Sequence, residues 1–510
     1  MSQRSLVAAL LLAAIAAAPA DPTGWQDEVL VAAGSRVSSR TGLAISTSSG
    51  AIHVAGATSQ CPQDCNFPWY CRSLDGGLSW STAVVIAGGP IVWNDNAIAL
   101  EARGGTVTAL APCQQTIYRD VSTDNGAKWQ GSGSMGQGSR PALTSLFGSR
   151  YAVWDDDRYG AESTEIFFKR SPDGGSTWSP PPGQGVPPDN AMRLTYLPGR
   201  SEEADICTEL PITQEAPPPL GGFIVVVWAD NCPGGPSADF DLRTNWSGTG
   251  GESWFYGTSG RPVLATGGDS RYPAIDCYEA VYPWTLHLVW QEGGNSICYT
   301  RSTDRGASWD SLQWIGTGYH PDVVADQYGV HVVWWTHGMY TDVIKYRRST
   351  DFGTNWDREV QLTSLQPSRI YSDSRWPKIT ADLQGRHVVF GDSREAGDAL
   401  AVWYKQNPNV HRAGGGQSAG VVAAEPASVA VWPNPTSGPV FIHLSRTLGE
   451  GVSVVAFDAQ GRVVKRLICS GSEARWDGRD ESGRRLAAGV YYLRPEGLDS
   501  GARTQVLVLR

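Results

Sequence analysis

Short stretches of alternating apolar and polar residues, bounded by turn-forming residues, recur along most of the chain. Thr285–Trp290 (TLHLVW) and Gly329–Trp334 (GVHVVW) have the length and the Val, Leu and Trp content of β-strands. The 510 residues include 59 Gly and 21 Trp, which suits many turns and many large apolar side chains. A chain of this length exceeds one ordinary hydrophobic core unless it is built from repeats. We therefore predict an all-β fold made of repeated units.

One phrase, Ser-x-Asp-x-Gly-x-x-Trp, recurs at intervals of about fifty residues in much of the chain. A sixth copy, Ser247–Trp254, has Thr249 in place of the Asp. Each copy follows a strand and leads into another, so it lies in a hairpin. There Gly permits a positive φ, the Asp carboxylate accepts N–H groups of the turn, and the Trp packs between sheets. We predict a structural role for the residues of the five intact copies, which are Ser73, Asp75, Gly77, Trp80, Asp124, Gly126, Trp129, Asp173, Gly175, Trp178, Asp304, Gly306, Trp309, Asp351, Gly353 and Trp356.

This phrase resembles the Asp-box, or BNR repeat, of sialidases (neuraminidases) and related β-propellers, and the resemblance covers roughly residues 25–410. It implies a propeller whose boxes lie on the face opposite the active site. Sialidases bind the substrate carboxylate with three arginines and use a Tyr–Glu pair and an Asp acid/base. They have six blades.

The strand pattern predicts seven four-stranded blades here, with six as the alternative. Sets of three strands begin near seven positions, and six box-type Trp residues precede a fourth strand. The segment Gly24–Gly34 (GWQDEVLVAAG) has the pattern of a fourth strand after a box Trp. We predict that it completes the last blade and closes the ring, which removes exposed sheet edges. The seven sets begin near Leu43, Ala97, Pro141, Ala204, Pro273, Pro321 and Pro377.

The remaining segments predict export. Residues 1–20 have the charged, apolar and small-residue regions of a signal peptide, residues 21–410 form the propeller, and residues 411–428 have the composition of a linker. Residues 429–510 predict a small Ig-like β-sandwich that resembles the sorting domain of bacterial type IX secretion and the Ig-like domain of flagellar hook-scaffolding proteins. The matching elements include Trp476-Asp477-Gly478 and Gly489-Val490-Tyr491. The resemblance implies the sorting machinery as a partner and a secreted or surface-attached protein.

Charge and cysteine usage narrow the ligand classes. A net charge of −10 argues against nucleic acid and anionic membrane surfaces as partners, and no segment predicts a transmembrane helix. Nine Cys in an exported chain permit disulfides, but Cys61, Cys65 and Cys71 lack the spacing of a zinc site. We expect neither a metal ion nor a cofactor.

Charged residues gather where the first strand of a blade begins and where the second ends, so we expect them to converge on the face opposite the boxes. If they form a sialidase-type site, arginine forks hold a carboxylate and acids act on the glycosidic bond. In the other interpretation they are ion pairs between blades. The candidate ligand-binding residues are Arg140, Arg158, Arg271, His320, Arg375 and Arg394. The candidate catalytic residues are Asp155, Asp157, Glu202 and Tyr371.

The first inner strand lacks the Arg-Ile-Pro motif of sialidases, since it reads TGLAISTSS. The sequence therefore predicts an exported, sialidase-like propeller that binds glycans or proteins at the bacterial cell surface without the full sialidase machinery. The alternative is an exo-glycosidase of the exo-α-sialidase type that hydrolyses terminal acidic sugars.

Overall fold

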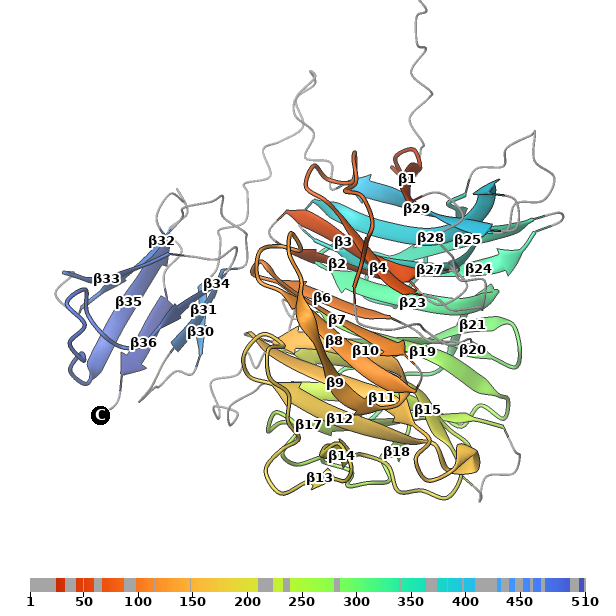
Figure 1. Ribbon diagram of the computed structural model, residues 1–510, viewed down its shortest axis with the longest axis horizontal. Helices are drawn as coiled ribbons and strands as arrows, with labels where there is room; N and C mark the ends of the chain where they lie inside the picture. The colour runs from red at the N-terminus through yellow and green to blue at the C-terminus, as the bar shows by residue number, and fades with distance from the viewer. Residues whose placement is uncertain are drawn as a thin grey trace, which may run out of the picture.

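The computed structural model describes two groups of residues. The first group comprises residues 24–32, 43–48, 50–58, 67–86, 98–113, 115–146, 148–209, 223–232, 239–278, 285–338, 341–363, 374–382, 384–396 and 399–408. The second comprises residues 429–432, 440–444, 453–458, 462–468, 473–495 and 504–508. Nearly all regular structure is β, apart from one 3-10 turn at Ala161–Ser163 (Figure 1). Across these ranges, no helix has the length and apolarity that a membrane span needs.

The first group forms seven antiparallel sheets, which we number blades 1 to 7 in the order of their inner strands. The inner strands are β2 (Ala44–Ser48), β6 (Ala99–Arg103), β10 (Ser139–Leu146), β15 (Ser201–Glu209), β19 (Ser270–Tyr278), β23 (Tyr319–Asp326) and β27 (Ser374–Ala381). The second strands are β3 (Ala51–Thr58), β7 (Thr106–Cys113), β11 (Ser149–Asp156), β16 (Phe223–Asp230), β20 (Thr285–Glu292), β24 (Gly329–His337) and β28 (Gly385–Ala396).

The third strands are β4 (Phe67–Ser73), β8 (Thr116–Ser122), β12 (Glu165–Ser171), β17 (Asp241–Ser247), β21 (Ser296–Ser302), β25 (Asp342–Ser349) and β29 (Ala399–Pro408). The outer strands are β5 (Val84–Val85), β9 (Gln130–Gln137), β14 (Ala191–Arg193), β18 (Arg261–Pro262), β22 (Gln313–Thr317), β26 (Val360–Gln361) and β1 (Val29–Ala32). Blade 3 departs from the predicted four strands, because β13 (Gly185–Val186) pairs with β14 as a fifth.

The inner strands contact one another in chain order, and β27 contacts β2, so the seven sheets close into a β-propeller. The prediction of seven blades is confirmed. The prediction for the N-terminal segment is also confirmed, because β1 pairs with β29 of blade 7. Trp25, just before β1, packs edge-on against Tyr346 of blade 6 with ring centroids 5.0 Å apart. A box Trp makes the same contact in blade 2, where Trp129 lies 4.7 Å from Tyr70 of blade 1.

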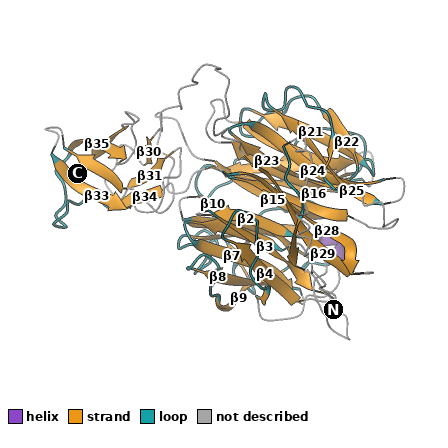
Figure 2. Ribbon diagram, turned by 90° about the horizontal axis from the view of Figure 1, so that it is seen from above, coloured by secondary structure: helices purple, strands orange, loops and turns teal. Residues whose placement is uncertain are grey.

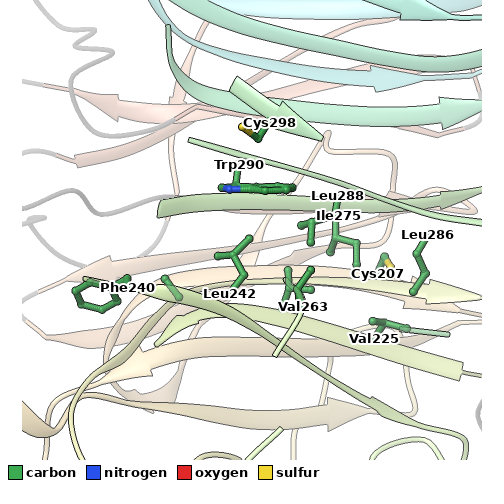
Figure 3. Close-up of a cluster of buried hydrophobic side chains, with 12 residues drawn as sticks. Cys207, Val225, Phe240, Leu242, Val263, Ile275, Leu286, Leu288, Trp290 and Cys298 are labelled. Carbon is green, nitrogen blue, oxygen red and sulfur yellow. The ribbon is translucent and has the colours of Figure 1, made fainter. Parts of the chain in front are cut away.

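The hydrophobic core lies between neighbouring blades. In Figure 3, Val225 and Leu242 of blade 4 and Leu288 and Trp290 of blade 5 belong to one buried cluster. The second strands of four blades carry a fully buried Trp two or three residues before they end, which explains the recurrent apolar run before Trp in the sequence. These residues are Trp154, Trp228, Trp290 and Trp334.

Each Asp-box lies in the hairpin after a third strand, as the sequence predicts. In blade 5, Asp304 Oδ1 accepts hydrogen bonds from Ser302 Oγ (2.8 Å) and from the backbone N–H of Ser308 (2.7 Å), while Ser302 Oγ accepts the N–H of Gly306 (2.8 Å). The box of blade 1 has the same bonds, and the hydrogen bonds from Ser79 lower the pKa of Asp75 to about 2. The turn is therefore held by its own side chains.

The box Gly is also a contact between blades. A Cβ added to Gly126 would stand 1.7 Å from the hydroxyl of Tyr70 in the preceding blade, and one added to Gly353 would stand 1.8 Å from that of Tyr299. Each of these tyrosine hydroxyls meets a buried His of its own blade, at 2.7 Å for His53 and 2.8 Å for His287. At the end of the ring that carries the boxes, which we call the box face, the same His–Tyr–Gly contact thus joins blade 1 to blade 2 and blade 5 to blade 6.

Strands β30 (Val429–Trp432), β31 (Val440–Leu444) and β34 (Glu473–Trp476) form one sheet of a second body (Figure 2). The other sheet contains β32 (Ser453–Phe457), β33 (Val463–Ile468), β35 (Gly489–Pro495) and β36 (Thr504–Val508). Buried Ile442, Trp476 and Leu493 belong to their shared core. Its Ig-like topology stays a prediction, as do the domain boundaries. The predicted signal peptide and linker lie outside the described residues.

Candidate functional site

The inner strands of blades 3 to 7 share a bulge near the end where they begin, and we call this end of the ring the rim. The pairing of each inner strand with the second strand shifts register there. One residue of every bulge has a positive φ although it is not Gly. A left-handed conformation costs such a residue about 1–2 kcal/mol, and conformations of this kind cluster at functional sites. The five residues are Arg140, Glu203, Tyr272, His320 and Trp376, with φ between 47° and 60°.

Blades 3 to 5 carry an ionic rim cluster, which consists of Arg140, Asp155, Glu202, Glu203 and Arg271. Arg140 donates from Nε to Asp155 (2.7 Å) and from Nη2 to Glu202 (2.6 Å). Arg271 donates from Nη2 to Glu203 (2.6 Å) and from Nε to the other oxygen of that carboxylate (3.2 Å). Burial raises the pKa of Asp155 to about 6. The structure thus brings four predicted site residues together, and each arginine already donates two hydrogen bonds to carboxylates of the protein.

Blades 5 to 7 carry an aromatic rim cluster, which consists of Tyr272, Tyr319, His320, Trp335 and Trp376. The His320 ring lies between two neighbours, with centroids 4.0 Å from Tyr272 and 4.1 Å from Trp376. Tyr319 stacks on the buried Trp335 at 4.5 Å. Burial, assisted by the charge of Lys378, lowers the pKa of His320 to about 3, so the imidazole is uncharged near neutral pH. The cluster is a set of flat, uncharged rings, of which Tyr272, His320 and Trp376 are half-buried.

Arg375 joins the aromatic rim cluster to a buried carboxylate. Its guanidinium lies 5.0 Å from the ring centroid of Trp335, and it forms an ion pair with Asp342. The other oxygen of Asp342 lies 2.6 Å from Nδ1 of His337, whose side chain is 60% exposed. Arg375 is therefore separate from the pair of arginines in the ionic rim cluster.

The remaining predicted residues have local partners or lie outside the described part of the chain. Arg158 donates to Asp156 (2.8 Å) and Asp189 (2.8 Å), and Asp157 accepts a hydrogen bond from Gln137 (3.3 Å). Arg394 binds Asp392 (2.6 Å) and also pairs with Glu28, which precedes β1. This ion pair connects the N-terminal segment to β28 of blade 7. Tyr371 lies outside the described residues.

Sequence reasoning missed Tyr272 and Trp376, because it selected Arg271 and Arg375, which stand one residue earlier. The structure does place both arginines at the beginning of their strands, as predicted, but the sequence interpretation did not include the bulge that follows each of them. A usable signal is present, because Pro follows the left-handed residue in four of the five bulges. Proline has no N–H to offer to a ladder, so it fits a bulge.

Metal chemistry has no evident centre in the part of the chain that the structure describes, since no three His, Cys, Asp or Glu side chains gather there as metal ligands.

No family model matches this chain, and no curated protein matches it. Among solved structures, an α-L-arabinofuranosidase from Fusarium graminearum is 12% identical, with a TM-score of 0.43 over 65% of this chain and 94% of that one. The polysaccharide lyase Uly1 is 11% identical, with a TM-score of 0.48 over 74% and 92%. PorZ, a bacterial surface component of the type IX secretion system of Porphyromonas gingivalis, is 15% identical, with a TM-score of 0.39 over 91% and 59%. These similarities assign neither a family nor a ligand to the chain.

Proposed function

We propose that this protein is an exported β-propeller that binds carbohydrate at the aromatic rim cluster. The observation that carries the proposal is the contact of Tyr272, His320 and Trp376, three half-buried rings on successive blades, each in a left-handed conformation. A sugar ring presents C–H groups on one face, and these suit the electron-rich face of an aromatic ring. Polar groups beside the rings fix orientation in carbohydrate and other small-ligand sites. His337 and Arg375 stand at the edge of this cluster.

Binding without hydrolysis is the version that the ionic rim cluster favours. A sialidase-type site needs arginine forks that face the substrate carboxylate. Here Arg140 and Arg271 donate to Glu202 and Glu203, and exchanging these partners for a ligand would leave buried carboxylates unpaired. We therefore rank exo-α-sialidase activity second. It would require these arginines to release their carboxylates when substrate binds.

The cellular part of the proposal rests on sequence. The signal peptide predicted at residues 1–20 would direct export, and the sorting-type domain predicted at residues 429–510 would present the ring at the cell surface through the secretion machinery. Glycans of the surroundings or of the surface itself are then the ligands.

The decisive variant is Trp376→Ala, tested on a glycan array and by titration of the glycans that the wild type retains. Loss of one stacking ring should weaken binding about tenfold or more. The matched control is Trp314→Ala, because Trp314 is 59% exposed on the outer strand of blade 5. Equal glycan binding by all three proteins would refute the proposal.

Arg271→Ala and Arg375→Ala separate the two versions of the function. If the protein is a sialidase, both variants should lose binding of carboxylated glycans, and the wild type should release the fluorophore from a fluorogenic sialoside. If it binds through the aromatic rim cluster, Arg271→Ala should leave neutral glycan binding unchanged and no fluorophore should appear.

A further inference from the structure

Blade 4 differs from blades 5 and 6 in one cross-strand pair on the box face. The pair consists of the residue before the box Ser and the residue after the box Trp. In blade 5 it is an ion pair, with Arg301 Nε 2.7 Å from Asp310, and in blade 6 Arg348 donates to Asp357 at 3.0 Å. In blade 4 the same positions hold Trp246 and Phe255, whose rings stack with centroids 4.7 Å apart and planes at 18°.

The backbone does not require this exchange of chemistry. The N–H of Phe255 donates to the carbonyl of Trp246 at 2.9 Å, and the backbone N–H of Asp310 donates to the carbonyl of Arg301 at the same distance. The box turn of blade 4 also keeps its shape, because Thr249 Oγ1 accepts the N–H of Ser253 at 2.8 Å. The hairpin of blade 4 therefore closes as that of blade 5 does, and the backbone at these positions accepts an Arg–Asp pair as well as an aromatic pair.

The aromatic pair belongs to a larger group of aromatic rings, the blade-4 patch, which consists of the exposed Phe255 and the half-buried Phe223, Trp246 and Tyr256. Phe255 is 65% exposed, and Phe223 packs 5.6 Å from Trp246. A Cβ on Gly248 would come within 3.0 Å of Phe223 and 3.4 Å of Trp246, so the missing side chain makes room for both rings. The Trp246–Phe255 stack, the packing of Phe223 and the missing side chain of Gly248 thus combine to present the Phe255 ring to solvent.

The chemistry around the patch selects the class of ligand. Thr249 replaces the carboxylate of the other boxes, and the one charged side chain of the adjoining turn, Glu252, pairs with Arg170 of blade 3 at 3.0 Å. The Arg305 guanidinium of blade 5 lies 3.7 Å from the ring centroid of Phe223 and follows the exposed Asp304 in the chain, so charges of both signs border the patch and neither sign dominates. One exposed phenyl ring with its neighbours is also far smaller than the roughly 800 Å² per partner of a stable protein interface. An uncharged sugar ring matches both the size and the charge.

We infer that the blade-4 patch binds a neutral sugar unit of a carbohydrate chain, on the face of the ring opposite the rim. The site is separate from the aromatic rim cluster, because the pairing of β16 with β17 places Ser247 and Phe223 at one end of the blade and Asp230 at the other. A substitution that abolishes ligand binding at one site should therefore leave binding at the other site unchanged.

The test converts blade 4 to the chemistry of blade 5. Trp246→Arg combined with Phe255→Asp rebuilds the ion pair and should preserve folding. Wild type, this double variant, Phe255→Ala and Trp376→Ala are compared by affinity electrophoresis in gels that contain dextran, laminarin, galactomannan or xylan. We expect at least one polysaccharide to retard the wild type, and both blade-4 variants to bind it about tenfold more weakly or worse. Trp376→Ala should keep the affinity of the blade-4 patch.

Equal retardation of the wild type and both blade-4 variants would overturn the inference, and so would a wild type that none of the four polysaccharides retards. Light scattering tests the competing interpretation, in which a second copy of this chain occupies the patch. If the wild type is a dimer that Phe255→Ala converts to a monomer, the patch contacts a second copy and the sugar assignment is wrong. If Trp376→Ala is the only variant that loses binding at the rim, that result bears on the proposed function and does not bear on the blade-4 patch.

Discussion

The two ends of each blade are repeated in different ways. At the box face the side chains repeat, since in all five intact boxes the Ser hydroxyl donates to the Asp carboxylate and accepts the N–H of the Gly. At the rim the backbone repeats, since five blades have a bulge with a left-handed residue, but that residue is Arg, Glu, Tyr, His or Trp. A side chain that recurs in blade after blade with the same bonds meets a requirement of the fold. A repeated backbone conformation with varied side chains does not fix the side-chain type, so the side chains at these positions can be suited to a ligand.

The largest expected effect comes from Trp25→Ala at the box face. Trp25 is 3% exposed and closes the ring against Tyr346. Replacing a buried Trp by Ala should lower the free energy of unfolding by about 3–5 kcal/mol. Chemical denaturation measures this loss, and the exposed Trp314→Ala should lose almost nothing. A small loss in Trp25→Ala would mean that the ring does not depend on this closure.

Gly126→Ala tests whether the box Gly is needed for the contact between blades or only for its backbone conformation. Gly126 and Gly105 have φ of 79° and 80°, but a Cβ would meet Tyr70 at Gly126 and nothing within 4 Å at Gly105. We expect a loss of about 3 kcal/mol at Gly126, from strain together with overpacking, and about 1 kcal/mol at Gly105. Equal losses would show that only the conformation matters.

Between the two faces, the inner strands carry carboxylates that titrate unusually. Burial raises the pKa of Asp276 to about 7, and its carboxylate accepts the N–H of Ala325 at 2.8 Å. The folded state therefore keeps Asp276 protonated at pH values at which the unfolded chain has lost this proton. The protonation contributes its full stability below about pH 4, and this contribution is lost as pH rises to about 7. Asp276→Asn should therefore gain melting temperature relative to wild type progressively from pH 4 to 7. A constant difference across that range would contradict the assignment.

The smallest expected effect is that of Asp304 in the box of blade 5. Asp304→Ala removes the acceptor of the Ser308 N–H and should cost about 1 kcal/mol. Asp304→Thr should cost less, because Thr249 fills this position in blade 4. Neither change should alter carbohydrate binding at the rim, which a titration would show. Binding lost at unchanged stability would place the ligand at the box face of blade 5.

These two faces also explain what the sequence could and could not predict. The boxes and the closure by residues 24–34 were predictable, because Asp, Gly and Trp are required at fixed spacing for hydrogen bonds, a positive φ and packing. The rim was not, because its bulge is a property of the backbone that tolerates Arg140 in one blade and Trp376 in another. The predicted arginines converge only in part, since contacts across blades depend on register. The sequence therefore could not show that Arg140 and Arg271 each form ion pairs with both Glu202 and Glu203.

The pairing of β1 with β29 has a consequence for the time course of synthesis. Glu28 and Arg394, which pair beside this closure, are 366 residues apart in the chain. A ribosome adds about 5–20 residues per second, so β1 waits roughly 20–70 s before its partner strand exists. Throughout that interval the first blade lacks its neighbour on one side and β1 is an open edge, which other strands can occupy. The last stretch of the ring to be made is thus the one that ends the period of greatest exposure to misassembly.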